Sequence, residues 1–290
     1  MAFLWGMRTL VAAAAAAPLA FAGLPAAAAD IPDKTADILL VHGFGSDCSA
    51  LNAAKDHFQE QVHVGAVKTV GYRGTDDCDV DLPASDNDTP IQEVAADLAH
   101  YVDDHYSSVR PVNIVGHSMG GLVTRVALLG SAQEWTEPDF PDGKLPVNNV
   151  VTLGTPHQGI ADPDQHDAGQ WEQMRPHSGF MKRLRADGNG LDADWAAGTD
   201  WTLVGSAEDK TVTYTSAIDE GNRADKKFGY QDDPEDADAV THDGLRTIGE
   251  GAFSLRYWEK GEPTQETENG WAPLETAYNA ATHLDDDLPS

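Results

Sequence analysis

Positively charged residues are scarce in this sequence. Lysine and arginine number 19 against 48 aspartates and glutamates, and the formal net charge is -29 at pH 7. Nucleic acids and anionic membranes attract proteins through basic surfaces, so this imbalance argues against both as electrostatic partners. We expect a strongly solvated, soluble protein suited to salt, with a specific cationic partner as the alternative.

Cysteine is also rare, since the chain contains only Cys48 and Cys78. Two cysteines are too few for a structural zinc site. In an exported protein, an even pair is most simply one disulfide. This bond would close a loop of about 30 residues and contribute roughly 3 kcal/mol in the chain-entropy model. Two free thiols are the alternative.

The N-terminal segment 1–29 lacks cysteine, so a lipid-modified N-terminus is not expected. The segment has Arg8 near its front, then an apolar alanine-rich stretch, then small residues before Asp30. This order is typical of a secretory signal peptide. A membrane anchor is the alternative, but Pro18 and Pro25 make a poor spanning helix. We therefore expect a secreted, extracellular protein without stable membrane insertion.

The remaining chain, 30–290, has no internal repeat, and its length suits a single α/β domain with a substantial core. Short aliphatic runs predict strands, and apolar residues at helical spacing predict helices. The predicted strands are 38–41, 65–74, 111–116, 147–156 and 200–206, and the predicted helices are 49–62, 89–105 and 118–130. This alternation predicts an α/β fold, with a mainly parallel central sheet and helices on both faces.

Two helix ends and one acidic stretch carry further predictions. Thr89 can cap the helix that Pro90 opens, and Gly130 is expected to end the helix after Ser118. Residues 219–241 read as an irregular acidic segment. We expect a solvated surface there, with a calcium loop as the alternative, although the spacing does not match the EF-hand pattern.

A serine lies between two glycines at the end of a predicted strand. Gly116-His117-Ser118-Met119-Gly120 fits the pattern G-x-S-x-G and is followed by a predicted helix. In this strand–turn–helix context the serine occupies a sharp, strained turn, and its hydroxyl projects above the carboxyl end of the sheet. The sequence therefore predicts that Ser118 is a nucleophile, with a plain glycine turn as the alternative.

A serine hydroxyl needs a base, and the base needs an orienting acid. For this turn the expected chain order is serine, then acid, then histidine. Asp209 follows the predicted strand 200–206, and His242 lies in a later loop. We therefore predict that Ser118, Asp209 and His242 form a catalytic triad. The rival acids are Glu208 and Asp219, and the rival histidines are His157, His166, His177 and His283.

An acyl-transfer site also needs backbone N–H groups that hold the developing oxyanion. One is expected from Met119, which follows the nucleophile, and one from the loop after an early strand. The stretch "VHGFG" (41–45) is the candidate loop, with the Phe44 N–H as donor. The alternative for this stretch is a glycine turn without a catalytic role.

Four stretches, "LLVHGFGSD", "GHSMGGLVTR", "TLGTPHQG" and "GSAEDKTV", resemble the secreted bacterial lipases and esterases of the α/β-hydrolase fold. The resemblance covers about 38–245. It implies that the residue after the His-Gly pair and the residue after the serine form the oxyanion hole, which are Phe44 and Met119 here. It also implies an acid after the sixth or seventh strand and a histidine in a late loop. The long acidic insertion between Asp209 and His242 departs from the family pattern.

The resemblance implies a secreted serine hydrolase that cleaves carboxylic esters, of the triacylglycerol lipase or esterase kind. An acyltransferase, an amidase or a phospholipase on the same triad is the alternative, as is a non-catalytic binding protein. The chemistry requires no metal and no organic cofactor. We expect a small-molecule or lipid ester as the partner and a monomeric protein.

Residues 155–199 interrupt the alternation of strands and helices. They include Trp171, Met174, Phe180 and Met181, and Pro176 is expected to split any helix there. These side chains would form either a flap that walls an acyl chain or plain packing against the core.

Overall fold

The computed structural model describes residues 36–61, 65–74, 77–160, 166–231 and 239–282. Contacts divide the chain into Met1–Ile31 and Pro32–Ser290, and the description below concerns the second unit. The predicted signal peptide (1–29) lies outside the described residues. The signal peptide and the single domain over 30–290 therefore stay predictions.

The centre of the fold is a sheet whose described strands follow the order β3-β2-β1-β4-β5-β6-β7-β8-β9. The strands are β1 (Ile38–Val41), β2 (Val67–Gly71), β3 (Val80–Asp81), β4 (Val112–His117), β5 (Val147–Leu153), β6 (Asp200–Ser206), β7 (Lys226–Tyr230), β8 (Phe253–Glu259) and β9 (Gln265–Gly270). The pairs from β3 to β7 are parallel, and β7–β8 and β8–β9 are antiparallel. The predicted, mainly parallel sheet is therefore confirmed.

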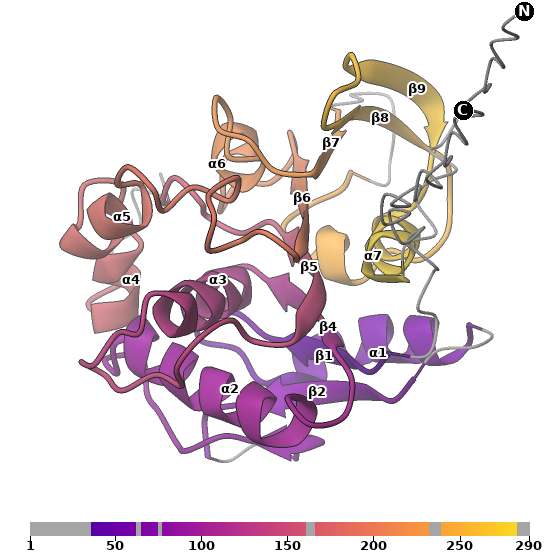
Figure 1. Ribbon diagram of the computed structural model, residues 1–290. Coiled ribbons are helices and arrows are strands. Elements are labelled where there is room, and N and C mark those ends of the chain that lie inside the picture. Colours follow the sequence, from indigo (N-terminus) through magenta and orange to yellow (C-terminus); the bar gives the residue numbers. More distant parts are fainter. Residues whose placement is uncertain (1–35, 62–64, 75–76, 161–165, 232–238, 283–290) are drawn as a thin grey trace, which may run out of the picture. The chain divides into compact units, whose positions relative to one another are not determined.

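Helices cover both faces of this sheet (Figure 1). Their bounds are α1 (Asn52–Gln59), α2 (Ile91–Tyr106), α3 (Met119–Ala132), α4 (Gly169–Gln173), α5 (Gly179–Leu184), α6 (Tyr214–Ala217) and α7 (Pro273–Thr282), with 3-10 turns η1 (Cys48–Leu51) and η2 (Gly244–Arg246). Helices α2 and α3 pack in one hydrophobic cluster, and α1 and α7 pack in the other. The α/β fold class predicted from the sequence is confirmed.

Strand β1 shows why the sheet separates two cores. Leu39 and Val41 belong to the cluster with α2 and α3, whereas Ile38 and Leu40 belong to the cluster with α1 and α7. Successive side chains of a strand point to opposite faces, so an unbroken aliphatic run serves both clusters. All four residues are fully buried, and β1 lies inside the sheet between β2 and β4.

Both predicted helix-end signals are wrong. Gly130 lies inside α3, which continues to Ala132, and the ring of Phe140 packs against the space that a Cβ of Gly130 would fill. Thr89 makes no capping bond to α2 and instead bonds to Asp86. The Ile91 N–H donates to the Oε1 atom of Gln173 at 2.8 Å. Tertiary contacts therefore replaced both local signals.

The segment 219–241 is less irregular than the sequence suggested. It contains β7, which pairs with β6 and β8 inside the sheet. Strands β8 and β9 extend that edge as an antiparallel hairpin that the sequence analysis did not predict. Most of the acidic stretch, 232–238, lies outside the described residues, so the calcium alternative is not tested there.

Candidate active site

Ser118 occupies the turn between β4 and α3. Its backbone has φ 55 and ψ -126, and a positive φ in a residue other than glycine is strained. The Ser118 N–H donates to the carbonyl of Leu153 at 2.8 Å, and the hydroxyl of Thr155 donates to the carbonyl of Ser118 at 2.9 Å. The end of β5 therefore holds the strained turn on both sides.

The glycines around Ser118 are required by close backbone approach. A Cβ on Gly116 would lie 2.6 Å from the nitrogen of Gly121. A Cβ on Gly120 would overlap the backbone of Val41 at the end of β1. Larger residues at these positions would push α3 away from β4 and β1. The glycines thus let the turn sit tightly at the carboxyl end of the sheet, with the Ser118 side chain partly exposed.

Asp209 and His242 form a close pair. The Nδ1 atom of His242 donates to the Oδ2 atom of Asp209 at 2.6 Å. The Asp209 side chain is fully buried, and its Oδ1 atom accepts from the N–H groups of Thr211 and Val212 at 2.8 Å each. Three hydrogen bonds therefore fix the carboxylate, while the imidazole remains 17% exposed.

The pair lies beside the Ser118 turn. His117, the residue before Ser118, donates from Nε2 to the carbonyl of His242 at 2.9 Å. Gly154 follows β5 and faces both residues of the pair. A Cβ added to it would lie 3.1 Å from the Oδ2 atom of Asp209 and 3.1 Å from the Nδ1 atom of His242. The three predicted residues thus lie in one region, where the loop that contains His242 meets the carboxyl ends of β4, β5 and β6.

His117 is a structural part of this region that the sequence analysis did not single out. Its ring is buried, and its centroid is 4.6 Å from that of His242. Burial is the main cause that holds the pKa of His117 well below its ordinary value, and the nearby charge of His242 acts in the same direction. A neutral His117 that donates from Nε2 anchors the backbone of the His242 loop.

The loop after β1 approaches the Ser118 turn from the other side. A Cβ on Gly43 would lie 2.8 Å from the Cβ of Ser118, so only glycine fits this position. The next peptide N–H belongs to Phe44, and the N–H of Met119 stands at the open first turn of α3. Both predicted oxyanion donors therefore belong to residues that adjoin Ser118 or its contact Gly43.

The Phe44 ring packs against the segment that interrupts the α/β alternation. Its centroid lies 5.3 Å from the ring of Trp171 and 5.7 Å from that of His166. Trp171 is buried, as are Met174, Phe180, Met181 and Leu184, and all five belong to the core cluster with α2 and α3. Pro176 lies between α4 and α5, as expected. The segment therefore packs on the core, with α4 next to the Phe44 loop.

The rival acids have other contacts. Glu208 forms an ion pair with Lys210 at 3.2 Å. Asp219 is buried and accepts from Gln158 and Asn222. Neither contact involves His242, so the structure favours Asp209 as its partner.

Among the rival histidines, His157 is fully buried and has no contact with Asp209 among its hydrogen bonds. Its Nδ1 atom lies 3.2 Å from a guanidinium nitrogen of Arg125, and its Nε2 atom lies 3.0 Å from the hydroxyl of Thr152. Burial, followed by the Arg125 charge, lowers the pKa of His157 to about 3. His166 packs against Phe44 and Trp171, and His283 lies outside the described residues.

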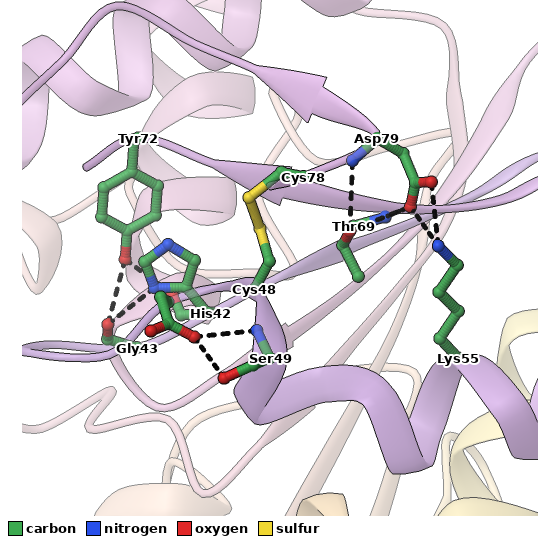
Figure 2. The surroundings of a disulfide bond; sticks show 10 residues. His42, Gly43, Cys48, Ser49, Lys55, Thr69, Tyr72, Cys78 and Asp79 are labelled. Carbon is green, nitrogen blue, oxygen red and sulfur yellow. Dashed lines mark hydrogen bonds and ion pairs between the residues drawn. A yellow bond between two sulfur atoms is a disulfide. The ribbon is translucent and has the colours of Figure 1, made fainter. Parts of the chain in front are cut away.

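Cys48 and Cys78 form a disulfide, with their Cα atoms 5.7 Å apart (Figure 2). The bond joins the start of η1, just after the Phe44 loop, to the segment between β2 and β3. Gly71 at the end of β2 lies against both sulfur atoms, and a Cβ there would overlap Cys78. The predicted pairing is therefore present in the structure, and it lies near the candidate site.

Cavities among the described residues include two that contain none of the triad side chains. One of about 640 Å³ is lined by the loop around His242, including Thr241, Asp243 and Gly244. Another of about 240 Å³ lies over β7 and β8, against Tyr214 and Arg256. In the described residues, no group of three or more histidine, cysteine, aspartate or glutamate side chains is arranged to hold a metal ion. No helix in the same residues is long and apolar enough to cross a membrane.

One protein family and several solved structures are similar to this chain. The family described as "Putative serine esterase (DUF676)" matches residues 33–194, more than half of the chain, which include Ser118 but neither Asp209 nor His242. No curated protein matches the sequence.

Among solved structures, the chain is similar to lipase B of Aspergillus fumigatus, with 15% identity, 73% of this chain and 49% of that chain covered, and a TM-score of 0.50. Mature lipase BlEst2 of Bacillus licheniformis is 19% identical, with 65% and 81% covered and a TM-score of 0.47. The product of lin2722 from Listeria innocua is 15% identical, with 85% and 93% covered and a TM-score of 0.49. The chain thus spans about half the length of the Aspergillus enzyme, and at this identity the likeness concerns the fold.

Proposed function

The chain belongs to the DUF676 serine esterase family, and from this premise we propose that it hydrolyses carboxylic esters through Ser118, His242 and Asp209. The observation that carries the proposal is the 2.6 Å contact between His242 and the buried carboxylate of Asp209, beside the strained Ser118 turn. The family match extends only to residue 194, so the roles of the acid and the histidine rest on geometry and chain order.

The contact with Asp209 determines what His242 can do. A carboxylate accepts hydrogen bonds, so the Nδ1 atom of His242 carries the proton that lies between them. The Nε2 atom then keeps its lone pair and can accept the proton of the Ser118 hydroxyl. Asp209 fixes this tautomer and stabilises the imidazolium that forms when the proton arrives.

The reaction then proceeds in two halves. The Ser118 Oγ atom attacks the ester carbonyl, and the resulting oxyanion is held by the N–H groups of Phe44 and Met119. His242 returns the proton to the departing alcohol, which leaves an acyl group on Ser118. Water, deprotonated by His242, attacks the acyl group and releases the acid, and Ser118 regains its proton.

We propose acyl glycerols or other acyl esters as the substrate class. The ring of Phe44, packed on Trp171, gives the loop beside Ser118 an apolar lining that suits an acyl chain. A panel of p-nitrophenyl esters of graded chain length, an emulsified triglyceride and a phospholipid would define the preference. Transfer of the acyl group to an alcohol or amine, measured beside release of the free acid, separates hydrolysis from acyl transfer.

A fluorophosphonate probe and three variants test the mechanism. We expect wild-type protein to be labelled at Ser118 and to hydrolyse a short ester. Ser118→Ala and His242→Ala should each lower kcat by about 10⁴-fold or more, and Asp209→Asn by roughly 10³- to 10⁴-fold. Glu208→Gln, which changes the neighbouring carboxylate, is the matched control and should stay within about twofold of wild type. Normal labelling of both the Asp209 and His242 variants would rule out this triad.

We also propose that the protein is exported. The Cys48–Cys78 disulfide supports this, because such bonds form and persist in oxidising compartments. If the N-terminal segment is a signal peptide, mass spectrometry of protein from the culture medium should find Asp30 as the first residue. Recovery of only the uncleaved chain, inside the cell, would contradict the proposal.

A further inference from the structure

The loop between β1 and η1, here called the Phe44 loop (42–47), is anchored at both ends, but the glycines between the ends do not restrict its backbone. Its first residues continue from β1, and its end runs into η1, where the Asp47 carboxylate accepts from the Ser49 N–H at 2.8 Å. Cys48 then ties η1 to Cys78. Between these anchors the chain runs through Gly43 and Gly45, so something else has to fix the orientation of its peptide groups.

Tyr72 supplies contacts at that place. It follows β2 and is 1% exposed. Its hydroxyl donates to the carbonyl of His42 at 2.7 Å and lies 3.2 Å from the carbonyl oxygen of Gly43 (Figure 2). The Tyr72 ring stacks on the ring of His42, with centroids 4.0 Å apart and 15° between the planes. Tyr72 therefore contacts two successive peptide groups and the side chain of His42.

His42 adds a second donor to the same peptide. Its Nδ1 atom donates to the carbonyl of Gly43 at 3.0 Å. The Tyr72 stack holds the plane of this ring, so the direction of the Nδ1–H bond is also set by Tyr72. His42 is fully buried, which shields both interactions from water.

Peptide planarity converts these contacts into a statement about Phe44. The Gly43 carbonyl and the Phe44 N–H belong to one trans peptide group and point in opposite directions. Holding the carbonyl toward His42 and Tyr72 therefore holds the Phe44 N–H on the opposite side. Gly43 itself lies against the Ser118 side chain. A peptide flip would exchange the N–H donor for a carbonyl oxygen, which repels an oxyanion.

We infer that Tyr72 is a positioning residue for the oxyanion hole, acting through His42 and the Gly43–Phe44 peptide. The inference rests on the proposed esterase function of Ser118. It assigns to Tyr72 a role in the transition state rather than in substrate binding, because the oxyanion exists only after Ser118 has attacked. Removal of the Tyr72 hydroxyl tests this role, because the ring can still stack on His42 while the hydrogen bonds to the two carbonyls are lost.

The test is Tyr72→Phe, assayed with a short p-nitrophenyl ester. We expect kcat to fall about 10- to 100-fold and KM to change less than about twofold, because a loosely held donor stabilises the oxyanion less well. An alkylboronic acid, which adds to Ser118 as a tetrahedral mimic, should bind more weakly by a similar factor. These two readouts would not move if Tyr72 only supported the fold.

Tyr230→Phe is the matched control. Tyr230 is also 1% exposed, and its hydroxyl bonds to the Trp271 carbonyl and the Thr276 hydroxyl, neither of which belongs to a residue of the proposed triad or oxyanion hole. We expect its kcat to stay within about twofold of wild type even if its melting temperature falls. If Tyr72→Phe does not fold, His42→Phe, which keeps a stacked ring and loses the donor, takes the same test.

The outcomes separate the two proposals. A wild-type protein that neither hydrolyses the ester nor reacts with the fluorophosphonate contradicts the esterase function itself. An active wild type whose Tyr72→Phe variant keeps its kcat and its boronate affinity overturns the role of Tyr72 alone. A fall in kcat that the Tyr230→Phe control reproduces would also overturn it, because the effect would then follow from stability.

Discussion

His157 illustrates how a single buried residue couples stability to pH. Arginine can only donate hydrogen bonds, so the contact with Arg125 makes the Nδ1 atom of His157 an acceptor. The Nε2 atom therefore carries the hydrogen and donates to the Thr152 hydroxyl. This neutral tautomer agrees with a pKa of about 3, which burial and the Arg125 charge produce. Protonation of His157 would break the contact with Arg125.

We expect His157 to reduce the stability of the fold as the solution becomes acidic. The unfolded chain takes up a proton near the ordinary histidine pKa of about 6.5, whereas the folded chain does not until about pH 3. Below pH 6.5 the unfolded state thus binds more protons than the folded state. The free energy of unfolding therefore decreases as the pH is lowered. The expected loss from this one residue is about 2 kcal/mol between pH 8 and pH 5.

Urea denaturation at several pH values measures this effect. At pH 8 the His157→Gln variant should be less stable than wild type, because it loses the imidazole contacts with Arg125 and Thr152. Its stability should nevertheless decline less than that of wild type as the pH is lowered to 5. His117 is also buried with a lowered pKa, so part of the pH dependence will remain in the variant. Parallel curves for the two proteins would show that His157 does not carry this linkage.

The residues of the candidate site differed in how far the sequence could identify them. Ser118 could be predicted because its signal is local: glycines two positions away and a strand before a helix. Asp209 and His242 were predicted only through chain order, and the contact between them is visible only in the fold. Tyr72 and Arg125 carry no local signal, because their roles arise from contacts with segments far away along the chain.

At the scale of elements, Arg125 links the nucleophile helix to the segment that interrupts the sheet pattern. From α3 it donates to the carbonyls of Leu184 at 2.9 Å and Asn189 at 3.0 Å. Leu184 ends α5, so the guanidinium supplies donors to a helix terminus that lacks intrahelical partners. Gln133, just after α3, adds a bond to the Asn189 side chain at 2.7 Å. These bonds join α3, which begins directly after Ser118, to the segment that contains α5.

The elements predicted from the sequence were those with strong periodicity. The buried parallel strands β1, β2, β4, β5 and β6 and the helices α2 and α3 follow continuous or helical apolar patterns, whereas the two-residue strand β3 was not predicted. Strand β9 reads "QETENG" and is mostly exposed, so it has no apolar pattern to recognise. Gly130 was expected to end its helix, yet α3 continues past it, and Phe140 packs closely over this glycine. Tertiary packing thus decided the elements that the sequence left open.

At the scale of the whole molecule, the acidic charge is the dominant electrostatic feature. The excess of acidic over basic residues gives a formal net charge of -29. Pairs such as Lys55–Asp79 and Lys68–Asp37 offset it locally, at 2.7 Å and 3.0 Å. With 19 basic residues, most carboxylates have no cation to pair with, and the folded chain brings like charges closer together than the unfolded chain does.

We therefore expect added salt to stabilise the fold. The screening length falls from about 30 Å at 0.01 M to about 10 Å at 0.1 M ionic strength, so repulsion across the surface weakens over this range. The melting temperature should rise with NaCl up to a few tenths molar, and replacing exposed acidic residues by neutral ones should reduce the rise. A melting temperature that stays flat or falls would contradict self-repulsion as a net cost of folding.

Calcium chloride at equal ionic strength separates general screening from a bound ion. Screening depends on ionic strength, so both salts should give nearly the same curve if the acidic residues of 219–241 that lie outside β7 bind no ion. A calcium site would instead give an additional rise that saturates at low calcium concentration, because a ligand bound to the folded state alone stabilises it by mass action. Removal of that additional rise by a chelator, with the NaCl curve unchanged, would assign it to a bound ion rather than to repulsion among the carboxylates.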